Sequence, residues 1–63
     1  MYEKFAGLLL KNNKTIYRVC VDTGIATATI YDWRDGKSTP KADKIKKIAD
    51  YFGVSMEYFY EDE

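Results

Sequence analysis

The sequence predicts an all-α fold of five short helices, compact and confined to a single domain of residues 1–63. Apolar residues recur at helical spacing along most of the chain. Residues that favour helix ends separate these stretches at short intervals. No segment alternates apolar and polar residues for long enough to form a convincing strand.

The first helix is expected over residues 2–11 and ends at the Asn12–Asn13 pair. Thr15 suits the N-cap of a second helix, and Gly24 suits its C-terminal end. The residues of these two helices expected to face inward are Phe5, Leu8, Leu9, Val19 and Cys20.

A third helix is expected over residues 27–34. The Thr39–Pro40 pair predicts the start of a fourth helix, since it combines an N-cap residue with a proline at the first helical position. Gly53 is expected to end that helix. Ser55 is predicted to cap a fifth helix over about residues 56–60. The residues of the third and fourth helices expected to face inward are Ile30, Trp33, Ile45, Ile48, Ala49 and Phe52.

Size and cysteine content limit the kinds of protein that this chain can be. Of its 63 residues, 46% are hydrophobic, which is enough for a small core. No apolar run approaches the roughly 20 residues that span a bilayer, and the N-terminus lacks the organisation of a signal peptide. The single cysteine, Cys20, allows no internal disulfide, which favours the reducing cytoplasm.

The net charge is zero, but the charges are unevenly distributed. Residues 1–56 hold all ten Lys and Arg residues and six acids, a net charge of +4, whereas residues 57–63 hold four acids and no base. A basic body with an acidic end is compatible with a surface that faces phosphates. Ordinary solvated charge is the alternative explanation.

Residues 15–34 carry the pattern of a helix-turn-helix. Two short helices that cross steeply need a small residue between them and a turn residue that can adopt a left-handed conformation. Cys20 and Gly24 meet these needs, because a β-carbon at Gly24 would cost energy. The apolar anchors that complete the pattern are Ile25, Ile30 and Trp33.

At these residues the chain resembles the helix-turn-helix DNA-binding domains of the phage repressor and Cro type, also called lambda-repressor-like or XRE-family domains. The similarity runs from about Phe5 to Tyr60. It is most specific at the TGI turn, the W-x-x-G-K-S-x-P loop and the I-A-x-Y-F-G-V-S run. The resemblance implies a five-helix fold that binds a palindromic double-stranded DNA operator as a homodimer, with the third helix in the major groove.

Three positions depart from the pattern of many members of that family. Thr15–Ile16 stands where the second helix often begins Ser-Gln, and Cys20 stands where alanine is common. The chain therefore lacks the glutamine that touches DNA in those members. Ala26 stands where a serine usually caps the third helix, and the loss of such a cap costs typically about 1 kcal/mol of helix stability.

Small residues open the third helix, and the first turn of a recognition helix is the part that approaches base edges. We therefore expect Thr27 to hydrogen-bond a base or phosphate and Ala28 to touch a thymine methyl group. Tyr31 either reads a base or forms part of a packed surface. Asp32 can accept from a cytosine amino group; alternatively, it pairs with a nearby lysine or discriminates against wrong sequences.

Other residues are expected to bind DNA phosphates. The start of the second helix, at Thr15 and Ile16, offers unpaired amides and the positive end of the helix dipole. Thr29 either reaches a phosphate or packs against the turn. The loop after the third helix and the start of the next one add Lys37, Ser38 and Lys41. Each lysine could instead be solvated surface.

The last helix is rich in large apolar side chains. The family resemblance implies that it forms a two-fold dimer contact through Met56, Tyr58 and Tyr60. The alternative is that two of its large side chains simply cover the core of their own domain.

An enzyme is not expected, because the chain has no histidine and Cys20 lies at an inward position without a base partner. The sequence implies no metal, cofactor, small-molecule ligand or membrane. The alternative function is a helical protein-interaction module or an antitoxin that binds a protein partner. The chain could be a complete Cro-like regulator or the N-terminal domain of a longer repressor.

Overall fold

The computed structural model describes residues 1–61 and contains five α-helices within that range. They are α1 (Tyr2–Asn12), α2 (Ile16–Thr23), α3 (Thr27–Arg34), α4 (Ala42–Phe52) and α5 (Glu57–Tyr60). No strand occurs among these residues, so the predicted all-α fold is confirmed. The acidic end noted in the sequence includes Asp62 and Glu63, which lie outside the described residues.

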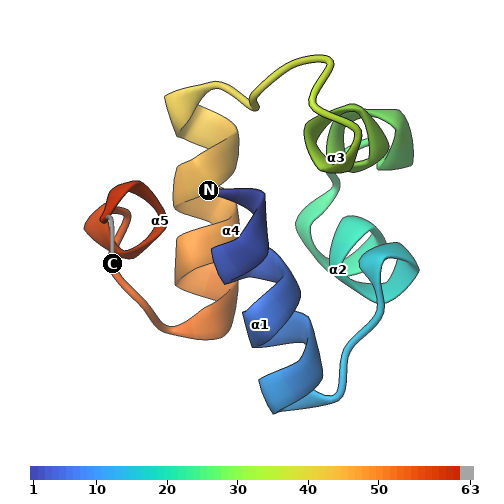
Figure 1. The fold of residues 1–63 in the computed structure, drawn as a ribbon. Helices are drawn as coiled ribbons and strands as arrows, with labels where there is room; N and C mark the ends of the chain where they lie inside the picture. Colours follow the sequence, from blue (N-terminus) through green and yellow to red (C-terminus); the bar gives the residue numbers. More distant parts are fainter. Residues whose placement is uncertain (62–63) are drawn as a thin grey trace.

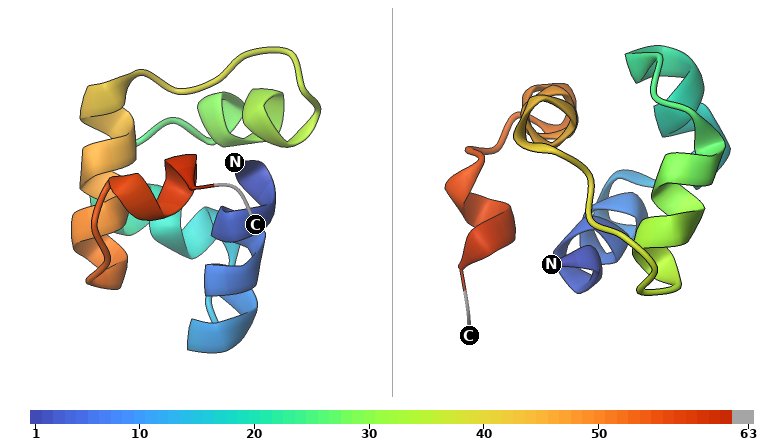
Figure 2. Two further views of the ribbon diagram at one scale, coloured as in Figure 1. Left: turned by 60° about the vertical axis from the view of Figure 1, so that its left-hand side comes forward. Right: turned by 90° about the horizontal axis from the view of Figure 1, so that it is seen from above.

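The helices α1 and α4 form the middle of the molecule, with the α2–α3 pair on one side and α5 on the other (Figure 1 and Figure 2). The helix α2 contacts both α3 and α4, whereas α5 contacts α1. The two helices of the helix-turn-helix therefore lie at an edge of the fold, supported from behind by the other helices.

An aromatic cluster from four helices lies in the core. Phe5 of α1 is 5.4 Å from Trp33 of α3 and 6.1 Å from Phe52 of α4, measured between ring centroids. Trp33 is in turn 6.3 Å from Phe59 of α5. The residues expected to face inward are buried, except that Leu9 and Phe52 are partly buried against the core.

Thr15 and Gly24 define the two ends of α2, as predicted. The Thr15 hydroxyl accepts a hydrogen bond from the Arg18 amide at 3.1 Å. Gly24 has a φ of 78°, in the left-handed region that glycine adopts at little cost, and its amide donates to the Cys20 carbonyl at 2.9 Å. Ala26 occupies the N-cap of α3 and provides no side-chain hydrogen bond there.

The predicted start of α4 at Thr39–Pro40 is wrong by two residues. Lys41 is the N-cap, and its carbonyl accepts hydrogen bonds from the amides of Lys44 and Ile45. Pro40 is buried in the loop that precedes the helix. The proline therefore lies buried in this loop instead of at the first position of the helix.

The predicted cap of α5 by Ser55 is also wrong. Met56 is the N-cap of this helix, and no side chain caps it. Ser55 contributes its backbone carbonyl, which accepts from the Tyr58 amide at 3.1 Å. The turn into α5 is therefore closed by backbone hydrogen bonds.

Candidate nucleic-acid interface

The first turn of α3 presents small side chains to solvent. Thr27 and Ala28 are exposed there, while Ile30 and Trp33 are buried on the opposite side of the helix. A helix that enters a DNA groove needs this arrangement, because its first-turn side chains must approach base edges while its other face stays fixed to the core.

The remaining predicted residues of α3 differ in exposure. Tyr31 is 39% exposed, whereas Thr29 and Asp32 are half-buried. Within residues 1–61, the Asp32 carboxylate forms no ion pair, so a lysine partner is not seen there. This carboxylate is therefore available as an acceptor at the edge of the exposed face.

The N-terminus of α2 offers backbone donors. Thr15 is exposed and Ile16 is half-buried. The Thr15 hydroxyl satisfies the Arg18 amide, but the amides of Ile16 and Tyr17 lie in the first turn and have no acceptor within the helix. Together with the positive end of the helix dipole, these amides can hold a phosphate.

The loop between α3 and α4 carries the predicted lysines. Lys37, Ser38 and Lys41 are all exposed. Gly36 has a φ of 77° and reverses the chain after α3, so that the amides of Lys37 and Ser38 donate to the Asp32 carbonyl at 2.8 and 3.4 Å. These hydrogen bonds place Lys37 beside the C-terminal end of α3.

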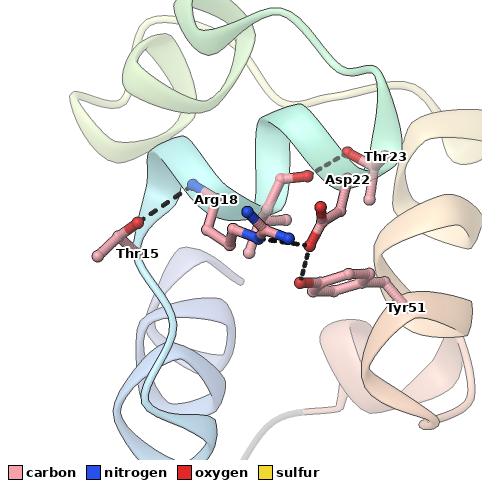
Figure 3. A network of polar contacts seen from close by, with 6 residues as sticks. Thr15, Arg18, Asp22, Thr23 and Tyr51 are labelled. Atoms are coloured by element: carbon pink, nitrogen blue, oxygen red, sulfur yellow. Dashed lines mark hydrogen bonds and ion pairs between the residues drawn. The ribbon is translucent and has the colours of Figure 1, made fainter.

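A polar network that the sequence did not predict joins α2 to α4. The Asp22 carboxylate accepts from the Tyr51 hydroxyl at 2.5 Å and from Arg18 Nε at 3.2 Å (Figure 3). The hydrogen bond from Tyr51, supported by the nearby Arg18 charge, holds the pKa of Asp22 below its usual value. Arg18 is thereby held along α2, next to Asp22.

The residues predicted for a dimer contact divide into two groups. Met56 and Tyr58 are half-buried and pack against the core, whereas Tyr60 is 51% exposed. The ammonium of Lys4 lies 5.1 Å from the centre of the Tyr58 ring. The apolar area of α5 that a second molecule could cover is therefore concentrated at Tyr60.

No helix in the described part of the chain is long and apolar enough to cross a membrane. A family model described as the Cro/C1-type HTH DNA-binding domain matches residues 4–63. Comparisons with curated proteins and with solved structures gave no match. The matched range includes the α2–α3 pair and nearly all of α1, so the similarity extends over the whole fold.

Proposed function

The chain belongs to the family of Cro/C1-type helix-turn-helix DNA-binding domains, and we propose that it is a sequence-specific transcriptional regulator that places α3 in the major groove of double-stranded DNA. The observation that carries this proposal is the outward face of α3. Thr27 and Ala28 project from it, while Ile30 and Trp33 fix the opposite face in the core. Such a helix can enter the groove without rearranging the domain.

The proposal separates residues that read sequence from residues that position the domain. Base edges are read by Thr27, Ala28, Tyr31 and Asp32. Phosphates are bound by Thr15, Ile16, Thr29, Lys37, Ser38 and Lys41. Contacts to phosphates carry no sequence information directly, so the two groups predict different mutational effects.

The regulator is proposed to be a phage-type repressor that binds a palindromic operator as a homodimer in the cytoplasm. The exposed ring of Tyr60 supports a weak contact between two copies through α5, to which the half-buried Met56 and Tyr58 contribute less. Sedimentation of the protein alone and with a palindromic duplex tests this contact. We expect dimerisation to be weak in free protein and firmer on DNA; a strict monomer on the palindrome contradicts the dimer.

The test of DNA binding is a titration against duplex DNA over a range of salt concentrations. We expect affinity to fall steeply with salt, with a log–log slope of about −0.9 for each phosphate neutralised. Selection of bound sequences from a random library then gives the half-site and its spacing. Selected half-sites about one helical turn apart, or a multiple of it, support a symmetric dimer.

The alternative function is a helical protein-interaction module, an antitoxin included. The exposure of Leu10 (86%) and Tyr17 (69%) favours it, because a protein partner could cover these large side chains. It predicts no DNA binding at low salt, or binding with flat salt dependence. Either result contradicts the proposed DNA-binding function.

A further inference from the structure

Arg34 extends the exposed stripe of α3 by one turn. Thr27, Tyr31 and Arg34 are separated by four and then three residues, the spacing that places side chains on the same side of an α-helix. All three residues are exposed. A duplex that lies along Thr27 and Tyr31 therefore also lies near Arg34.

Two neighbours hold the Arg34 guanidinium in place. Its central carbon lies 4.8 Å from the centre of the Tyr31 ring, which is within the range of a cation–π contact. Its Nε donates to Asp35 Oδ1 at 3.1 Å. Among residues 1–61, the hydrogen bond from Nε is the only one that the guanidinium makes, and the Arg34 side chain is 49% exposed. The outer edge of the guanidinium is therefore open to a ligand.

We propose that Arg34 binds a backbone phosphate of the DNA while it stays stacked on Tyr31. This inference rests on the proposed function, because it concerns the face of α3 that would meet the duplex. A planar guanidinium presents paired N–H donors that match the oxygens of a phosphate. Arg34 lies at the C-terminal end of α3, whereas the first turn of a recognition helix is the part that reaches base edges. A phosphate is therefore the ligand within reach.

Asp35 weakens this contact. Its carboxylate is paired with Arg34 and 44% exposed, so it cancels the positive charge of the guanidinium and repels an approaching phosphate. Replacing Asp35 with asparagine removes the negative charge and keeps a side chain of similar size. Arg34 and Asp35 substitutions should therefore change DNA affinity in opposite directions.

The experiment compares Arg34→Ala and Asp35→Asn with Arg18→Ala as the matched control. Arg18→Ala removes the same charge, but from a guanidinium that is held next to Asp22 on α2. Affinity for a selected palindromic duplex is measured over a range of salt concentrations, after thermal unfolding has shown that each variant is folded. Tyr31→Phe keeps the aromatic ring under the guanidinium, and Tyr31→Ala removes it.

For each half-site, we expect Arg34→Ala to reduce the steepness of the log–log dependence of affinity on salt by about 0.9. At 0.1 M salt, the affinity should fall by roughly tenfold for each half-site. Asp35→Asn should bind severalfold more tightly, while Arg18→Ala should stay within about twofold of the wild type. When Tyr31→Ala is already present, Arg34→Ala should reduce DNA affinity by less than it does in the wild type. When Tyr31→Phe is already present, Arg34→Ala should reduce affinity by as much as in the wild type.

Two results would overturn the role of Arg34 without touching the proposed function. In the first, the wild-type protein binds DNA with steep salt dependence, and Arg34→Ala binds with the same salt slope and the same affinity. The other is an equal loss in Arg34→Ala and Arg18→Ala, which would indicate a general effect of charge. If the wild-type protein binds no DNA, the proposed function itself has failed.

Discussion

The hydroxyl of Tyr51 donates a hydrogen bond to the carboxylate of Asp22, and this contact joins α4 to α2 across 29 positions of sequence. Arg18 donates to the same carboxylate from one turn earlier on α2 (Figure 3). Because α2 carries the first-turn amides proposed to bind a phosphate, the Tyr51–Asp22 hydrogen bond helps to set where those amides lie relative to the core.

The Tyr51–Asp22 hydrogen bond predicts a pH-dependent contribution to stability. It holds the pKa of Asp22 below the ordinary value of 3.8, so its stabilisation is fully present above that pH. The stabilisation is lost as the pH falls through the lower pKa of the folded state. We therefore expect Tyr51→Phe to melt below the wild type at about pH 7, with a smaller difference at about pH 2.5.

Circular dichroism measures both melting temperatures at each pH. Tyr17→Phe is the control, because its exposed hydroxyl forms no hydrogen bond within residues 1–61. Its difference from the wild type should not change with pH. An equal difference at both pH values in Tyr51→Phe would show that the hydroxyl does not act through the Asp22 charge.

Replacement by alanine should change the stability of the domain in opposite directions at two glycines. An added β-carbon meets nothing within 4 Å at either Gly24 or Gly7, so backbone conformation alone decides the effect. Gly24 has a φ of 78°, and alanine there is expected to cost about 1–2 kcal/mol. Gly7 lies within α1, where alanine should stabilise the domain by about 0.5–1 kcal/mol. Urea unfolding measures both changes, and a loss of stability at both positions would contradict this explanation.

Lys37→Ala and Thr27→Ala should separate the positioning of the domain from the reading of sequence. Lys37→Ala is expected to weaken binding to all duplexes and to lower the salt slope by about one per half-site. Thr27→Ala is expected to change the preference at one base position by about 1–3 kcal/mol and to leave the slope unchanged. Binding to the selected operator and to its single-base variants measures both effects. The division of roles is wrong if both substitutions have the same effect on every sequence.

The parts of the fold that could be predicted are set by residues that lie close together in the sequence. The cap at Thr15 and the turn at Gly24 each act within one turn of helix, so residue type and spacing were enough. Pro40 instead lies buried in the loop before α4, and burial depends on how distant parts of the chain pack around a residue, so residue type alone predicts the wrong start for this helix.

The same distinction applies to the candidate site. Helical periodicity placed Thr27 and Tyr31 on the outer face of α3, because each position follows from the buried anchors on the same helix. The stacking of Arg34 on Tyr31 depends on which rotamers the two side chains adopt. The Tyr51–Asp22 hydrogen bond depends on how α4 packs against α2. Neither contact can be predicted from the spacing of residues in the sequence.

The uncapped start of α3 offers a stabilising substitution. Ala26 has the extended backbone of an N-cap, with a φ of −64° and a ψ of 139°, but no side-chain oxygen to accept from the first-turn amides. The amide of Thr29 already donates to the Ala26 carbonyl at 3.1 Å, so in Ala26→Ser the new hydroxyl can accept from the amide of Ala28. We expect a gain of about 1 kcal/mol in the free energy of unfolding. Ala28→Ser is the matched control, since it adds the same hydroxyl in the first turn but beyond the N-cap, and it should cost no more than a few tenths of a kcal/mol. Urea unfolding distinguishes the two. A loss of stability in both variants would mean that the first-turn amides of α3 gain nothing from a side-chain acceptor, so the loop before the helix would already satisfy them.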